Sequence, residues 1–335
     1  MTRVAVIGTT AWGLTLGSML ARRGIDVAVL ARAPAEASAL SAARRSERLP
    51  AGVFFPRGLF VTANPSEALK AAEAVIVAVP SVTMRANIQR VAPALPRQSL
   101  VISATKGIEV ETGKRMSQLI SEEAPGHEPS LNGALSGPNL APEIAQGKAA
   151  SATVAFPDTG ASKAAQDILN SEVFRVYRSG DLTGVEMGGA LKNIIAIGAG
   201  IIDGSSLGDN AKAAYVTRGL HEMTRLGVAM GARAETFAGL SGMGDLVATC
   251  YSGLSRNRRV GQEIARGRPL QDILSGLKQT AEGVPTTLGA CRLADQYGVE
   301  LPITEMTRRV LFDGLPPPAA VEALMRRAPQ PEVRL

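Results

Sequence analysis

The first half of the chain alternates short apolar runs with segments whose apolar residues have helical spacing. The runs are Val4–Ile7, Val27–Leu30, Ala74–Ala78, Leu100–Ser103 and Ala152–Ala155, and they read as nearly continuous apolar runs instead of alternating with polar residues. Unbroken apolar strands are typical of parallel sheets that are buried on both faces. We therefore predict a strand at each of these places.

The segments between these runs are predicted to be helices. Helical spacing extends over Gly13–Arg23, Pro65–Ala71, Val82–Val91 and Gly113–Glu122, and Gly24 stands where a C-terminal helix cap is expected. Regular alternation of strands and helices is typical of a doubly wound α/β sheet. The first half is therefore predicted to have a Rossmann-like fold.

Beyond residue 182 the pattern indicates helices alone. Long helical patterns cover Val185–Ile202, Lys212–Met230 and Thr286–Tyr297, and no convincing strand follows Thr183. A chain of 335 residues is also too long for one ordinary core. We predict an α/β domain over residues 1–182 and an all-helical domain over residues 183–335.

Composition narrows the class of protein. Hydrophobic residues make up 45% and charged residues 20%, as in globular proteins, and the net charge of +6 favours anionic ligands such as phosphates. Aromatic residues are only 4% and the basic residues are dispersed, which argues against nucleic-acid binding. The two cysteines, Cys250 and Cys291, have no metal-ligand spacing and indicate a reducing compartment.

We expect a cytoplasmic protein without stable membrane insertion. The chain enters the strand Val4–Ile7 at once, which leaves no room for a signal peptide. The apolar run Ile194–Ile202 is too short to span a bilayer.

The loop from Gly8 to Gly13 is a candidate dinucleotide site. It reads Gly8-Thr9-Thr10-Ala11-Trp12-Gly13, follows a predicted strand and opens a predicted helix. Gly8 permits the tight turn, Gly13 allows close packing, and the free N–H groups of the helix suit a pyrophosphate. Thr10 stands where the fingerprint has its middle glycine, and its side chain is expected to keep the backbone further from the phosphates.

The end of the second strand bears on the choice of cofactor. An NAD-selective site places an acid about 20 residues after the loop, to accept from the ribose hydroxyls. This chain has Leu30-Ala31-Arg32 there, with no acid. Arg32 can pair with a 2′-phosphate, although it is also explained as an exposed loop residue. We predict NADPH as the cofactor, with NADH also possible.

Lys192 is the candidate proton-transfer residue. Its helix is apolar nearly all round, and another element can approach it closely at Gly188, Gly189, Ala196 and Ala199. Burial would lower the pKa of Lys192 into a useful range, unless the side chain reaches the surface instead. The only histidines, His127 and His221, are more easily explained as structural residues, which strengthens this assignment.

Two polar segments of the second half are hard to explain as core. They are Gly242–Leu246 and Ser255–Arg259. Ser255 could cap a helix, and Arg256 could hold a phosphate at the start of that helix. A solvated basic face is the alternative explanation of the second segment.

Together these segments resemble the bacterial glycerol-3-phosphate dehydrogenase (NAD(P)+) family. The resemblance covers almost the whole chain and is most specific over Lys192–Asp203, Gly208–Gly231 and Leu240–Gly261. It implies an NAD(P)-dependent oxidoreductase acting on a CH–OH group. Its reaction would be reversible hydride transfer that converts dihydroxyacetone phosphate to sn-glycerol 3-phosphate for glycerophospholipid synthesis. A homodimer is expected on the same ground.

The resemblance also implies roles for particular residues, in a first domain that binds NAD(P) and a second that binds substrate. Lys192 would be the proton acceptor and catalytic residue. The substrate would be bound by Lys106, Gly137, Asn139, Lys192, Asp245, Ser255, Arg256 and Asn257. The cofactor would be bound by Gly8, Ala11, Trp12, Gly13, Arg32, Lys106, Ala141, Arg256, Thr280 and Glu282. No metal is expected.

Some residues depart from the family pattern, and two other functions stay open. The family has glycine at Thr10, serine at Ala11 and Asn139, and valine at Thr280. A reductase of the β-hydroxyacid or 6-phosphogluconate type also uses a lysine on a helix, but leaves Leu240–Gly261 unexplained. A non-catalytic dinucleotide sensor would fit the altered loop, but has no need of proton-transfer residues.

Overall fold

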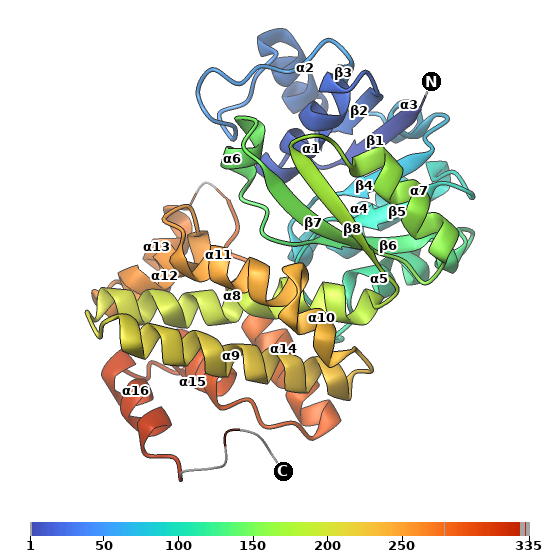
Figure 1. Cartoon of the computed structure of the whole chain (residues 1–335). Helices are drawn as coiled ribbons and strands as arrows, with labels where there is room; N and C mark the ends of the chain where they lie inside the picture. Colours follow the sequence, from blue (N-terminus) through green and yellow to red (C-terminus); the bar gives the residue numbers. More distant parts are fainter. Residues whose placement is uncertain (1, 278, 329–331, 333–335) are drawn as a thin grey trace.

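One sheet organises the first half of the protein. The computed structural model describes residues 2–277, 279–328 and 332. Its 8-stranded sheet has the order β3-β2-β1-β4-β5-β6-β7-β8, and Figure 1 shows it above the helical half. Neighbouring strands are parallel except β6 and β7, which are antiparallel. The strands are β1 (Arg3–Ile7), β2 (Asp26–Leu30), β3 (Leu59–Thr62), β4 (Ala74–Val77), β5 (Leu100–Ser103), β6 (Asn132–Ser136), β7 (Ala150–Ala155) and β8 (Phe174–Ser179).

The predicted strands are confirmed as β1, β2, β4, β5 and β7. β4 and β5 are buried at every position, as unbroken apolar runs require. The sequence pattern did not predict β3, β6 or β8. β3 and β8 lie at the sheet edges, where β8 is partly exposed, and β6 contains Asn132 and Gly133 in place of β-branched residues.

Helices cover both faces of this sheet. They are α1 (Ala11–Arg22), α2 (Pro34–Ala43), α3 (Pro65–Leu69), α4 (Met84–Val91), α5 (Met116–Glu123), α6 (Ala141–Ala145) and α7 (Thr159–Leu169). Gly24 follows α1 with φ of 82°, as its predicted place at the helix end requires. The helix predicted from Gly113 begins only at Met116, because the preceding residues form a turn closed by a bridge between Ile108 and Arg115.

The described residues of the second half form helices joined by loops, without a strand. Its helices are α8 (Leu182–Gly204), α9 (Asp209–Ala229), α10 (Ala234–Ala238), α11 (Asp245–Tyr251), α12 (Arg256–Ala265), α13 (Leu270–Ser275), α14 (Gly283–Tyr297), α15 (Pro302–Phe312) and α16 (Pro317–Met325). The three long predicted helices are confirmed as α8, α9 and α14. The division into domains 1–182 and 183–335 stays a prediction, and the chain passes from β8 to α8 at this point.

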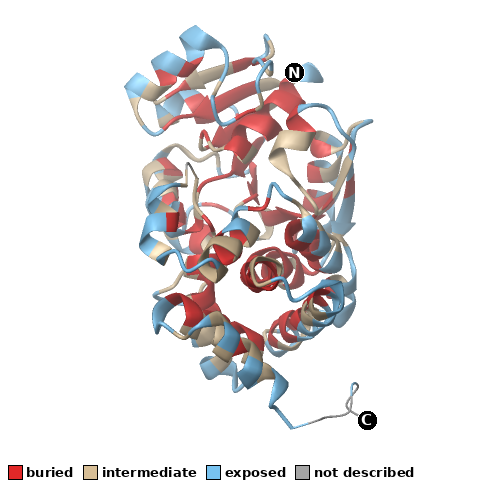
Figure 2. Cartoon of the chain, turned by 90° about the vertical axis from the view of Figure 1, so that its left-hand side faces the viewer, coloured by how far each residue is buried: buried red, intermediate tan, exposed pale blue. Residues whose placement is uncertain are grey.

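Helix α8 is the centre of the helical half. It packs against α9, α11, α12 and α14, and nearly every residue from Gly184 to Ile202 is buried. By length and composition it could cross a membrane, but its 18-residue apolar stretch is 100% buried inside the protein. Figure 2 shows the buried residues gathered in the sheet and in the interior helices. The helix is therefore a core element that holds its side chains in fixed positions.

A buried carboxylate on α8 joins the two halves. Glu186 accepts hydrogen bonds from the Ser117 backbone N–H at 2.8 Å and the Ser117 hydroxyl at 2.7 Å. It also forms an ion pair with Arg115. Because Ser117 lies in the first turn of α5, these bonds hold the helical half against the sheet domain. They help to fix the distance between residues that the two halves contribute to one site.

Candidate active site

Lys192 lies in the buried middle of α8, close to a carboxylate and a hydroxyl from α11. Its ammonium nitrogen Nζ is 3.0 Å from Asp245 Oδ1 and 2.7 Å from Thr249 Oγ1. The Thr249 hydroxyl donates to the Asp245 backbone oxygen at 2.6 Å, so its oxygen is free to accept from Lys192. A neutral amine would use its two hydrogens in these bonds and keep its lone pair for a substrate proton.

The approach of α11 depends on a special backbone feature. Leu240–Gly244 form a π-helical turn immediately before Asp245. A Cβ added at Gly188 of α8 would lie 2.6 Å from the Ser241 backbone oxygen, so only glycine lets this turn come so close. π-Helical turns occur frequently at functional sites, and this one brings Asp245 to Lys192.

The sheet domain supplies the second lysine of the site. Lys106 follows β5, and its Nζ donates to Asp245 Oδ2 at 2.6 Å and to the Gly137 backbone oxygen at 2.9 Å. Asp245 thus pairs with both lysines through its two carboxylate oxygens. Two lysines and one aspartate form a cluster at the junction of the two halves of the protein.

The environment lowers the pKa of Lys192 to about 8. Burial is the largest cause, because a desolvated ammonium group is destabilised. The negative charge of Asp245 raises the pKa and the positive charge of Lys106 lowers it. A lysine with a pKa of about 8 is present in both protonation states close to neutral pH.

Two buried side-chain oxygens, those of Asn139 and Ser136, have no hydrogen-bond partner among the described residues. The Asn139 side chain donates to the Ser151 backbone oxygen at 3.1 Å, but its Oδ1 is buried without a partner among the described residues. Ser136 Oγ is likewise buried and unpaired within the described part of the chain. A Cβ added at Gly189 would approach both Ser136 and Lys106, which places Ser136 beside the lysine cluster.

The start of α12 offers groups for an anion. Ser255 caps this helix by accepting from the Arg258 N–H at 3.2 Å, as predicted. Arg256 is the first residue of α12, and its Nη1 donates to the Thr280 backbone oxygen at 2.8 Å. Helix N-termini and guanidinium groups both favour phosphate.

The Asn257 side chain links three helices of the second half. Its side-chain amide donates to Asn193 Oδ1 at 2.7 Å and accepts from the Gly283 N–H at 3.0 Å. The amide therefore joins α8, α12 and α14.

Glu282 lies at the junction between the two halves. Its carboxylate accepts from the Ser81 backbone N–H at 3.2 Å and from the Ser81 hydroxyl. Burial raises the pKa of Glu282 above its usual value, while the hydrogen bonds from Ser81 lower it. Ser81 follows β4 in the sheet domain, so this contact joins the sheet domain to the helical half.

The glycine loop has the features that a dinucleotide requires. Gly8 has φ of 107°, and a Cβ there would lie 2.7 Å from the Ala78 backbone oxygen. Thr10 donates to this oxygen at 2.7 Å and accepts from the Gly13 N–H at 3.1 Å. Its hydroxyl therefore points towards Ala78 and caps α1. The N–H groups of Ala11 and Trp12 have no acceptor among the described residues, so they remain for phosphate oxygens.

Three predicted cofactor residues lie apart from the lysine cluster. The partly buried Trp12 ring packs on the core, with its centroid 6.3 Å from that of Phe174. Ala141 begins α6, and its backbone oxygen accepts from the Thr15 hydroxyl of α1 at 3.4 Å. Arg32 is exposed after β2.

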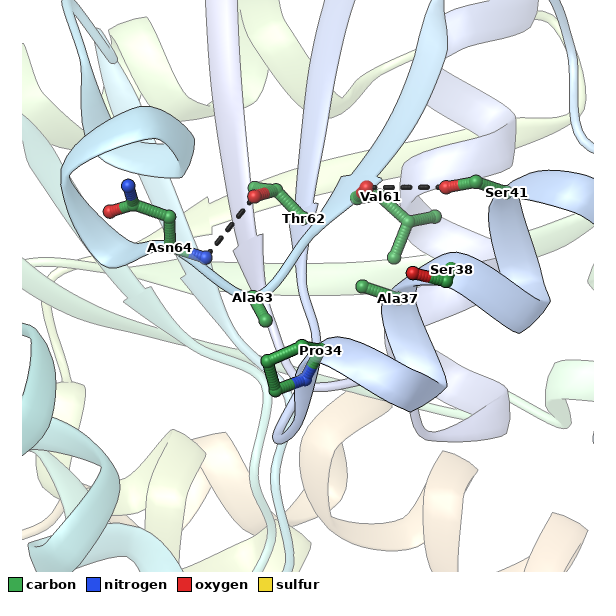
Figure 3. Close-up of a pocket in the computed structure, with 8 residues that line it drawn as sticks. All are labelled: Pro34, Ala37, Ser38, Ser41, Val61, Thr62, Ala63 and Asn64. Atoms are coloured by element: carbon green, nitrogen blue, oxygen red, sulfur yellow. Dashed lines mark hydrogen bonds between the residues drawn. The ribbon is translucent and has the colours of Figure 1, made fainter.

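A hollow of about 480 Å³ also lies at this edge of the sheet. Figure 3 shows it between α2 and the residues that follow β3, with Ser41 bonded to the Val61 backbone oxygen. It is lined by Pro34, Ala37, Ser38, Ser41, Val61, Thr62, Ala63 and Asn64. None of these residues is a predicted site residue, and the lining contains no ionisable side chain.

The structure adds polar residues that the sequence analysis missed. Thr249 could have been found from its position one helical turn after Asp245. Ser81 shows no such signal, because its partner Glu282 is distant in sequence. Glu36 lies on α2, and its carboxylate accepts a hydrogen bond from the Thr9 hydroxyl of the glycine loop at 2.7 Å. No group of His, Cys, Asp and Glu suited to a metal occurs among the described residues.

Comparisons with known proteins find relatives that match almost the whole chain. The family models for the N-terminus and C-terminus of NAD-dependent glycerol-3-phosphate dehydrogenase match residues 3–162 and 181–322. A glycerol-3-phosphate dehydrogenase [NAD(P)+] of Dehalococcoides mccartyi is 48% identical, over 97% of this chain and 91% of that protein. One from Chlorobium limicola is 43% identical, over 98% and 99%. The crystal structure of glycerol-3-phosphate dehydrogenase from Coxiella burnetii superposes with a TM-score of 0.92 at 32% identity, over 97% of this chain and 99% of that one.

Proposed function

Because the chain belongs to the NAD-dependent glycerol-3-phosphate dehydrogenase family, we propose that it interconverts dihydroxyacetone phosphate and sn-glycerol 3-phosphate. The observation that carries this function is the buried Lys192, which shares Asp245 with Lys106. This cluster can move one proton at a carbonyl or hydroxyl oxygen, as an oxidoreductase acting on a CH–OH group requires. The product in the reductive direction is a precursor of glycerophospholipids.

Lys192 is the general acid and base of the proposed reaction. When the alcohol is oxidised, its neutral amine accepts the proton of the C2 hydroxyl. When the ketone is reduced, its ammonium form returns that proton. Lys106 orients the same oxygen, and Asp245 holds both lysines in position. The nicotinamide, when bound, supplies the hydride chemistry.

The phosphate of the substrate is proposed to bind at the start of α12. Arg256 supplies a guanidinium group there, and the first N–H groups of the helix lie beside it. Ser255 keeps this helix start in place through its cap. Gly137 and Asn139 then lie against the three-carbon chain, next to Lys106.

The proposed cofactor is NADPH, with NADH accepted. Gly8, Ala11, Trp12 and Gly13 would hold the pyrophosphate. Arg32 lies at the end of β2, where a guanidinium can meet a 2′-phosphate. Ala141, Thr280 and Glu282 would border the remainder of the cofactor. We also propose a homodimer in the cytoplasm, with no nucleic-acid partner and no stable membrane insertion.

An assay of NADPH oxidation with dihydroxyacetone phosphate tests the proposed function. Turnover with this ketone supports it, provided that there is none with a 3-oxoacid or with the ketone formed by oxidation of 6-phosphogluconate. Turnover only with another carbonyl compound would favour a different reductase. Tight NADPH binding without any turnover would identify a nucleotide sensor and contradict the proposal.

The rate is expected to depend on pH through Lys192, whose pKa is about 8. Oxidation needs the neutral amine, so kcat/KM for glycerol 3-phosphate should rise with pH and level off above this pKa. Reduction needs the ammonium group, so kcat/KM for the ketone should be level below this pKa and fall above it. Measurements above pH 7 avoid the titration of the substrate phosphate, whose second pKa is about 6. Identical profiles in the two directions would contradict the assignment.

A further inference from the structure

The carboxylate of Glu36 lies at the carboxyl ends of β1 and β2, against the residues that follow these strands. Its Oε1 accepts from the Thr9 hydroxyl of the glycine loop at 2.7 Å. Its Oε2 accepts from the Arg32 backbone N–H, at the end of β2, at 3.3 Å. The group therefore joins the loop that meets the pyrophosphate to the strand end that meets the ribose. In this fold an acid at the end of the second strand binds the ribose hydroxyls. Glu36 supplies an acid there from the first turn of α2.

Arg48 brings the opposite charge to the same place. Its Nη1 is 2.8 Å from Glu36 Oε1 and donates to the Thr9 backbone oxygen at 3.2 Å. The Arg48 side chain is 41% exposed and that of Glu36 is 22% exposed, so both can be reached by a ligand. Burial raises the pKa of Glu36, but the hydrogen bonds from Thr9 and Arg48 outweigh it and the pKa is lowered. The carboxylate is therefore charged at neutral pH.

We propose that Glu36 and Arg48 together set the choice between NADH and NADPH, an inference that rests on the proposed function. Glu36 accepts from the 2′-hydroxyl of NADH and repels the 2′-phosphate of NADPH. Arg48 attracts this phosphate, and so does Arg32. In the wild-type protein the two effects oppose each other, which keeps NADH binding possible despite the arginines. The sequence predicted only the attraction of Arg32 for the 2′-phosphate. The opposing effect of Glu36 is added by the structure.

Direct binding of NADH and NADPH to the Glu36→Gln protein tests this proposal. The ratio of the dissociation constant for NADH to that for NADPH should rise about tenfold, because one charged hydrogen bond and one repulsion are lost. Arg48→Gln should lower the same ratio. Both constants can be measured by titration calorimetry without turnover, and the thermal midpoint of the nucleotide-free protein reports whether each variant folds.

Asp167→Asn is the matched control. Asp167 lies on α7 in an exposed ion pair with Lys163, and this substitution removes the same single negative charge as Glu36→Gln. It should leave the ratio unchanged, since its charge is not at the cofactor. A ratio that Glu36→Gln does not move, or that Asp167→Asn raises equally, would overturn the proposal. Failure of the wild-type protein to bind either nucleotide would contradict the proposed function itself.

Discussion

Replacing Lys192 with methionine is expected to lower kcat by about 10³-fold, within the range that general acid–base groups contribute. Methionine fills a similar volume but offers no amine, so the C2 oxygen loses its proton partner. Asp245 keeps Lys106 as a counter-ion, which limits the structural damage. The dissociation constant for NADPH should stay within about twofold, because Lys192 lies in the substrate half of the site. Steady-state kinetics and nucleotide titration measure the two quantities.

Lys212→Met is the control for this variant. Lys212 is also a buried lysine paired with an aspartate, but it lies on α9 and bonds to Asp203 at 2.8 Å and 2.9 Å. Its substitution should reduce thermal stability and leave kcat close to that of the wild type. Near wild-type turnover by the Lys192→Met protein would show that another group moves the proton.

Replacing Asp245 with asparagine is expected to lower kcat by about 10²-fold and to change its pH dependence. The negative charge of Asp245 raises the pKa of Lys192, and the positive charge of Lys106 lowers it. Without the carboxylate, the pKa of Lys192 falls below about 8 and the amine is more weakly basic. The rise of glycerol 3-phosphate oxidation with pH should therefore begin at lower pH. The measurement is kcat/KM across pH 7–10.

Asp203→Asn separates this electrostatic effect from a loss of stability. Asp203 also lies between two cations, Lys212 and Arg258, but it is outside the lysine cluster. Removing its charge should destabilise the fold, since the buried Lys212 and the partly buried Arg258 both lose their partner. The pH profile should stay that of the wild type. A shift of the profile in the Asp203→Asn protein as large as that in Asp245→Asn would rule out a specific role of Asp245.

Local patterns were sufficient to predict the buried framework. The strands β1, β4 and β5 are unbroken apolar runs, and α8 is apolar nearly all round, so each could be recognised from its own residues. Lys192 stood out for the same reason, because a lysine inside such a helix has to be paired. The edge strands β3 and β8 were missed, since a partly exposed strand lacks this pattern.

Contacts between distant segments could not be predicted in this way. The resemblance named Lys106, Lys192 and Asp245 separately, but their common cluster depends on the π-helical turn and on the space beside Gly188. Thr10 was expected to crowd the phosphates, and the structure turns its hydroxyl towards Ala78 instead. The interpretation that β2 is followed by no acid was incomplete, because Glu36 folds back from α2 to Thr9 and Arg32.

The central claim is that this protein transfers hydride between a nicotinamide and C2 of a three-carbon phosphate, with Lys192 supplying the proton. The most direct measurement uses NADPH deuterated at C4 of the nicotinamide, on either face, together with dihydroxyacetone phosphate. We predict that the deuterium from one face appears at C2 of the glycerol 3-phosphate formed, and that the Lys192→Met protein forms this product at a greatly reduced rate. Glycerol 3-phosphate that carries no deuterium at C2 from either face would contradict the account.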